Sequence, residues 1–256
     1  MSNLRIAAVQ FDIVWENRSA NFFRLDELLQ DLTNLDVIVL PEMFTTGFSM
    51  RPEVVAEKHH DEMETLQWMR HHASRLGALI MGTVSTSDEG LFKNRMYCVF
   101  PDGKYEFYDK ANLFKMGEEN NHYTKGNNRL IFEWRGWRIA PLICYDLRFP
   151  EWARNGMTND QANYDLLIYS ANWPEVRRHP WRTLLQARAI ENQAYVVGIN
   201  RVGDDDQRNY HSGDSLIIDP RGQVMQDGAG GQESILIETL DHSALQDFRA
   251  KFPVLF

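Results

Sequence analysis

Short apolar runs alternate with amphipathic stretches along the first third of the chain. The runs are nearly continuous in apolar residues, as is typical of parallel strands that are buried on both faces. The stretches between them carry apolar residues at helical spacing, and the second one is followed by Gly77, a common helix-capping residue. The predicted elements are strands 4–9, 36–40 and 78–84 and helices 17–32 and 61–76. Their order predicts a layered α/β sheet.

The second half of the chain repeats this pattern. One hairpin is predicted at Pro101-Asp102-Gly103 and another at Pro220-Arg221-Gly222. The other predicted elements are strand 137–143, a helix after Pro150, strand 166–170, helix 181–193, strand 195–200 and helix 241–252. Two similar halves predict two sheets packed in one body. Because no linker or low-complexity stretch divides the chain, we expect a single domain over residues 1–256, whose apolar end, 253–256, docks on a partner subunit.

Composition narrows the class of protein. The formal net charge of −9 argues against partners such as nucleic acid or an anionic membrane surface. No apolar stretch is long enough to cross a bilayer, and the chain enters a strand-like run after three residues, without a targeting segment. Two cysteines, Cys98 and Cys144, are too few for a disulfide scaffold and suit a reducing compartment. We therefore expect a cytoplasmic protein.

Three predicted strands are followed by a side chain with catalytic chemistry. Glu42 follows strand 36–40, Lys110 follows strand 105–108, and Cys144 follows strand 137–143. Ligand sites of open α/β sheets lie beyond the carboxyl ends of strands. A thiol at a strand-to-helix junction meets free backbone N–H groups and a helix N-terminus, which are expected to lower its pKa. A glutamate can serve it as general base and a lysine can stabilise an oxyanion, so this set predicts acyl transfer through a thioester.

Other residue patterns favour structural roles. Cys98 lies inside an apolar run and is expected to be a small buried hydrophobic residue. The histidine pairs 59–60 and 71–72 do not form a His-Glu-x-x-His pattern, so a solvated helix face is expected there and no metal site. Asp146 is expected to accept backbone N–H bonds at the turn after Cys144. Arg148 has two interpretations: it pairs with a nearby acid, or it binds a substrate carboxylate.

Three segments of the chain resemble the signature segments of the nitrilase, or carbon–nitrogen hydrolase, superfamily. They are Leu40-Pro41-Glu42-Met43-Phe44, Tyr108-Asp109-Lys110-Ala111-Asn112-Leu113-Phe114 and Ile143-Cys144-Tyr145-Asp146-Leu147-Arg148-Phe149-Pro150. The resemblance implies a four-layer α-β-β-α sandwich with a catalytic triad of Glu42, Lys110 and Cys144. It also implies a second acid after the lysine, for which Glu119 fits better than Glu118. Dimers are usual in this family, so a homodimer is expected.

Within the superfamily, the segments 144–149, 170–174 and 186–193 resemble the omega-amidase branch. This resemblance implies hydrolysis of the terminal amide of small dicarboxylate monoamides such as 2-oxoglutaramate, without a metal or organic cofactor. The backbone N–H of Tyr145 is expected to help bind the oxyanion. The residues expected to contact the substrate are Tyr145, Arg148, Phe44, Trp173 and Tyr123. The alternatives are a nitrile or N-carbamoyl hydrolase with the same triad, and a catalytically silent binding protein that keeps the fold.

Overall fold

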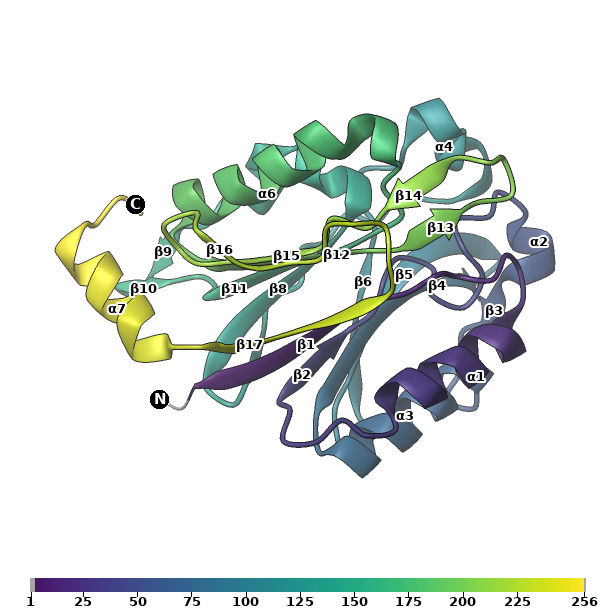
Figure 1. Cartoon of the computed structure of the whole chain (residues 1–256), viewed down its shortest axis with the longest axis horizontal. Coiled ribbons are helices and arrows are strands. Elements are labelled where there is room, and N and C mark those ends of the chain that lie inside the picture. The colour runs from purple at the N-terminus through teal and green to yellow at the C-terminus, as the bar shows by residue number, and fades with distance from the viewer. Residues whose placement is uncertain (1–2, 256) are drawn as a thin grey trace.

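The computed structural model describes residues 3–255, and in this part of the chain two β-sheets lie face to face between layers of helices (Figure 1). In the first sheet the strand order is β17-β1-β2-β4-β5-β6, and the short β3 pairs with β4. Its strands are β1 (Leu4–Gln10), β2 (Val37–Val39), β3 (Glu57–Lys58), β4 (Leu79–Asp88), β5 (Leu91–Val99), β6 (Tyr105–Asp109) and β17 (Ser234–Leu240).

In the second sheet the order is β16-β15-β12-β11-β8-β7. Its strands are β7 (Phe132–Trp134), β8 (Trp137–Ile143), β11 (Leu166–Ala171), β12 (Tyr195–Asn200), β15 (Leu216–Ile218) and β16 (Val224–Asp227). Two further strand pairs are β9 (Met157–Thr158) with β10 (Gln161–Ala162), and β13 (Val202–Asp204) with β14 (Tyr210–Ser212). In both large sheets the central strands are parallel, and antiparallel strands are added outside them.

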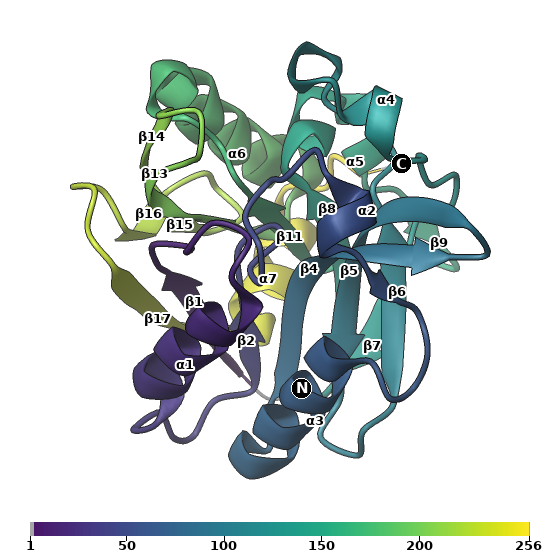
Figure 2. The same ribbon diagram turned by 90° about the vertical axis from the view of Figure 1, so that its right-hand side faces the viewer.

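Helices cover the outer faces of the two sheets (Figure 2). Helices α1 (Arg18–Leu29) and α3 (Glu64–Leu76) lie on the first sheet, and α6 (Arg178–Asn192) lies on the second. The remaining helices are α2 (Pro52–Val55), α4 (Glu119–His122), α5 (Pro150–Ala153), α7 (His242–Lys251) and the 3₁₀ turns η1 (Lys115–Gly117), η2 (Cys144–Arg148) and η3 (Glu175–Arg177). Among the residues that the structure describes, no helix is long and apolar enough to span a membrane.

The side-chain alternation along β1 explains why two layers form on each sheet. Leu4, Ile6 and Ala8 belong to the cluster that fills the space between the sheets, whereas Ala7 and Val9 pack with the buried faces of α1 and α3. Since both faces of this strand are buried, its sequence reads as one continuous apolar run.

The predicted four-layer α-β-β-α arrangement is confirmed, and so is the cap at Gly77, which has a left-handed φ of 61° at the end of α3. The expectation of two similar halves is wrong in one respect. Strand β17, which follows the second half, pairs antiparallel with β1 in the first sheet. No strand was predicted at Ser234–Leu240, although four of its seven residues are apolar. In the expected docking tail, Val254 and Leu255 are half-buried, and Phe256 lies outside the described residues.

Candidate active site

The ends of β2, β6 and β8 meet at one edge of the two-sheet body. Glu42 lies three residues beyond β2, Lys110 directly follows β6, and Cys144 is the first residue of η2, directly after β8. The two sheets are joined here, because the N–H of Glu42 donates to the carbonyl of Ala171 at 3.4 Å and the hydroxyl of Ser170 donates to the carbonyl of Leu40 at 2.9 Å. The chain segment that carries Glu42 is thereby fixed against β11 of the other sheet.

A fully buried charge cluster lies at this edge. The Lys110 ammonium is 2.8 Å from Oε1 of Glu42 and 2.9 Å from Oε2 of Glu119, and none of the three side chains has exposed surface. Burial lowers the pKa of Lys110, but the charges of Glu119 and Glu42 outweigh it and raise the pKa above its usual value. Burial also raises the pKa of Glu119. The lysine therefore stays charged, and the structure brings Glu119 rather than the exposed Glu118 to it.

Two asparagines, which sequence reasoning missed, hold the carboxylates in place. Nδ2 of Asn94, on β5, donates to Oε1 of Glu42 at 2.8 Å and to Oε1 of Glu119 at 3.0 Å. The backbone N–H of Asn172 donates to Oε2 of Glu42 at 2.9 Å, and its side-chain amide donates to the carbonyl of the same residue. Asn94 stands between Lys93 and Arg95 in the sequence, so no local pattern marked it as a buried residue of the site.

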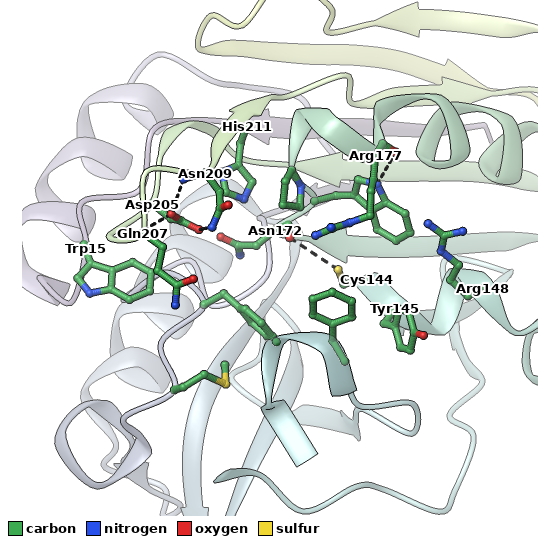
Figure 3. Close-up of a pocket in the computed structure, with 16 residues that line it drawn as sticks. Trp15, Cys144, Tyr145, Arg148, Asn172, Arg177, Asp205, Gln207, Asn209 and His211 are labelled. Carbon is green, nitrogen blue, oxygen red and sulfur yellow. Dashed lines mark hydrogen bonds between the residues drawn. The ribbon is translucent and has the colours of Figure 1, made fainter. Parts of the chain in front are cut away.

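Cys144 lies on a strained turn beside this cluster. Its φ of 43° is in the left-handed region, which costs a residue with a β-carbon about 1–2 kcal/mol. Its side chain is largely buried, and its thiol donates to the carbonyl of Asn172 at 3.9 Å (Figure 3). The turn therefore directs the sulfur toward the segment that also binds Glu42.

The expected lowering of the thiol pKa is wrong. Burial raises the pKa of Cys144 well above its usual value, and the negative charge of Glu42 raises it further, against the opposing effect of Lys110. One cation already faces two carboxylates in this cluster, so a thiolate would add a second uncompensated negative charge. The helix after the turn, α5, has only four residues and begins beyond η2, so its N-terminus is not at the sulfur. The resting form is the neutral thiol.

Asp146 shapes the turn, as the sequence predicted. Its carboxylate accepts from the backbone N–H of Ile143 at 3.0 Å and of Asn112 at 2.9 Å, and from the hydroxyl of Tyr108 at 2.8 Å. These bonds tie the turn after β8 to the segment that follows Lys110. Burial raises the pKa of Asp146, and the three donors oppose this effect.

A cavity of about 110 Å³ opens above Cys144 (Figure 3). Among the residues predicted to contact substrate, Tyr145, Arg148 and Trp173 line it. Arg148 pairs with neither nearby acid; its guanidinium lies 5.0 Å from the ring centre of Trp173. The other lining residues are Trp15, Phe48, Met50, Phe114, Gly117, Asn172, Pro174, Arg177, Asp205, Gln207, Asn209 and His211.

Phe44 and Tyr123 do not line this cavity, so their prediction as pocket walls is wrong. Phe44 has no exposed surface and packs in the core under α3, with its ring centre 5.8 Å from that of Trp68. The Tyr123 hydroxyl donates to the carbonyl of Ser49 at 2.8 Å and contacts the Ser85 hydroxyl at 3.0 Å. The Phe44 ring is thus part of the core, and the Tyr123 hydroxyl holds the backbone at Ser49.

A histidine, His211, lines the cavity. Between residues 3 and 255, no group of three or more His, Cys, Asp or Glu side chains is arranged to hold a metal ion. His211 is almost fully buried, and burial together with the charge of Arg201 lowers its pKa to about 4. This residue is therefore a neutral imidazole at physiological pH.

Comparisons with known proteins cover nearly the whole chain. Residues 5–250 match the family model described as carbon-nitrogen hydrolase. The chain is 47% identical to the omega-amidase YafV of Yersinia enterocolitica, over 99% of this chain and 96% of that protein. It is 34% identical to the 2-oxoglutaramate amidase of Bacillus subtilis, over 97% and 95% of the two chains.

A solved structure agrees with this fold. The crystal structure of XC1258 from Xanthomonas campestris, a CN-hydrolase superfamily protein with an arsenic adduct in the active site, aligns with a TM-score of 0.95 at 41% identity. The alignment covers 99% of this chain and 96% of that one.

Proposed function

Because the chain belongs to the carbon–nitrogen hydrolase family, we propose that it works as an omega-amidase through a cysteine thioester. It hydrolyses the terminal amide of small dicarboxylate monoamides, such as 2-oxoglutaramate, to the acid and ammonia. The observation that carries the proposed mechanism is the position of Glu42, held by Lys110, Asn94 and Asn172 on the side of Cys144.

The first half-reaction begins with a neutral thiol. Glu42 takes the thiol proton as the Cys144 sulfur attacks the amide carbon, so the thiolate forms only as the new bond forms. The carbonyl oxygen becomes an oxyanion between the Lys110 ammonium and the backbone N–H of Tyr145. Glu42 then gives its proton to the amide nitrogen, the carbon–nitrogen bond breaks, and ammonia leaves a thioester on Cys144.

The second half-reaction uses the same base. Glu42 takes a proton from water as the water oxygen attacks the thioester carbon. The carbon–sulfur bond breaks, the product acid is released, and the proton on Glu42 returns to the Cys144 sulfur. Lys110 keeps its charge through both steps because its pKa is raised, so it stabilises negative charge and does not carry the proton. Glu119 holds Lys110 in place from the other side.

The cavity has the composition of a site for a small anionic amide. Tyr145 and Trp173 form part of an aromatic wall, and Arg148 adds positive charge at the edge. These three residues are the substrate contacts that we carry over from the sequence. A nitrile or an N-carbamoyl substrate would meet the same triad, so turnover of different substrates must separate these alternatives.

The test combines a nucleophile variant with a substrate series. C144A is expected to abolish turnover of 2-oxoglutaramate while leaving the urea unfolding midpoint nearly unchanged. Mass spectrometry of the wild-type protein, quenched during turnover, should find the acyl group on Cys144. Residual amidase activity of C144A would overturn the mechanism. Faster turnover of a nitrile or an N-carbamoyl amino acid than of 2-oxoglutaramate would overturn the substrate class, and no turnover of any of them would favour a silent binding protein.

Three broader features complete this proposal. The two sheets share one buried cluster, which supports a single domain. Val254 and Leu255 keep part of their apolar surface exposed, which supports a homodimer in which the partner covers this end of the chain. Two free cysteines support a reducing, cytoplasmic location. Sedimentation of the wild-type protein and of a chain shortened after Lys251 tests the dimer, because equal dimer content in both would contradict docking through the tail.

A further inference from the structure

We propose that Arg177 binds the carboxylate at the far end of the substrate and thereby sets the preference for dicarboxylate monoamides. This inference rests on the proposed amidase function and adds a residue that the sequence motifs did not point to. It places the selective charge on Arg177, inside the cavity, rather than on Arg148 at its edge.

The first argument is the absence of an anionic partner. Arg178 and Arg182, which follow on the same stretch of chain, both contact the carboxylate of Asp214. Among the described residues, Arg177 forms no ion pair and its guanidinium donates no hydrogen bond. The partly buried guanidinium is therefore available to pair with an anion from outside the chain.

The second argument is the way Arg177 is held. The centre of its guanidinium lies 5.2 Å from the ring centre of Phe114, a cavity residue. Its own carbonyl accepts from Nε1 of Trp173 at 2.7 Å, which fixes η3 against the cavity wall. Phe114 in turn donates its backbone N–H to Glu119 at 2.6 Å. The guanidinium is therefore positioned on an aromatic surface that is connected to the catalytic cluster.

The third argument compares the charges around the cavity. In Figure 3 the Arg177 side chain extends across the cavity above Cys144, whereas Arg148 lies at the edge, beyond Tyr145. The acid in the lining, Asp205, accepts from the backbone N–H groups of Gln207 and Asn209 and from the Asn209 side chain. These bonds hold the Asp205 carboxylate within its own loop, and among the described residues it forms no ion pair with Arg177.

The substrate class follows from this placement. With its amide carbon at Cys144, a dicarboxylate monoamide would direct its carboxylate toward Arg177, where a guanidinium can donate two parallel hydrogen bonds. An uncharged amide of the same length has no carboxylate to accept these hydrogen bonds. The effect of Arg177 should therefore appear in the ratio of kcat/KM for charged and uncharged amides, and not in the chemical steps at Cys144.

The test measures kcat/KM for glutaramate and for pentanamide, its uncharged counterpart. Wild-type protein should prefer glutaramate, and R177M should lose about 10- to 100-fold on glutaramate while pentanamide turnover stays within about twofold. R177K should fall between the two, because an ammonium does not pair in two-point fashion. R148M, the matched variant at the edge, should lose less on glutaramate, and its loss should fade in high salt.

Pentanamide turnover shows directly whether each variant is folded and active. If R177M loses equally on both amides, or keeps the preference for glutaramate, the inference is wrong. It is also wrong if R148M and not R177M removes the preference. If wild-type protein turns over neither amide, the amidase proposal itself fails, and this outcome differs from an active enzyme in which Arg177 has no effect.

Discussion

Replacing Lys110 by methionine would remove the ammonium group between two buried carboxylates. The side chains of Glu42 and Glu119 have no exposed surface, and both accept hydrogen bonds from Asn94. Methionine has a similar length and no charge, so it fills the space without separating the two negative charges. The variant therefore measures how much free energy of unfolding is lost when the two carboxylates have no cation between them.

The expected loss follows from the burial of the cluster. Removing one partner of a buried ion pair costs about 3–5 kcal/mol, because the remaining charge stays out of water. Here two carboxylates remain, so one should take up a proton in the folded state and have a raised pKa. A carboxyl group whose pKa is raised on folding binds more protons folded than unfolded, so the free energy of unfolding falls as pH rises through that range. We expect K110M to lose about 3–5 kcal/mol near about pH 8 and clearly less near about pH 5.

Urea unfolding at the two pH values measures this difference. The control is K93M, because among the described residues the ammonium of Lys93 contacts only the carbonyl of Lys125, at 3.5 Å. The double variant K110M/E119Q should regain part of the loss, since glutamine accepts the Phe114 N–H without a charge. A loss for K110M that is below about 1 kcal/mol, or equal at both pH values, would refute the reasoning.

Two further variants address residues around the cluster. Burial lowers the pKa of His211 from 6.5 to about 4, so its contribution to stability is present above pH 6.5 and is lost as pH falls toward 4. Between about pH 7 and about pH 5, the free energy of unfolding in urea should therefore fall by about 2 kcal/mol more in wild-type protein than in H211N. An equal fall in the two proteins would contradict this. N94L removes the amide donor shared by Glu42 and Glu119 and should lower kcat on glutaramate about 100-fold with little change in KM, whereas an unchanged kcat would show that the carboxylates are held without it.

The parts of the site that sequence predicts well are those next to a clear strand. Glu42 and Cys144 each follow an apolar run with an evident end, and Lys110 follows a strand of mixed polarity after a hairpin turn, so their common edge could be inferred before the structure. Asn94 and Asn172 were missed because their roles depend on which side chains the two sheets bring opposite each other. No pattern within one segment contains that information.

Two errors have physical causes of the same kind. Aromatic residues such as Phe44 and Tyr123 are suited both to a core and to a cavity wall, and only the packing of neighbouring elements decides between these environments. The pKa of Cys144 depends on how many carboxylates and cations surround it. A strand-to-turn junction alone suggested a lowered pKa, whereas the assembled cluster raises it.

The pairing of β17 with β1 has a consequence for biosynthesis. Leu4 faces Leu240 and Gln10 faces Ser234. The strand that is synthesised first thus pairs with the strand that is synthesised last. A ribosome must release almost the entire polypeptide before the apolar edge of β1 can be covered. Until then a nascent chain exposes unpaired backbone groups beside a hydrophobic strand, which invites pairing with another molecule. Chains that terminate early, before β17, are therefore expected to need chaperones or to aggregate, even though every residue of the triad has already been made.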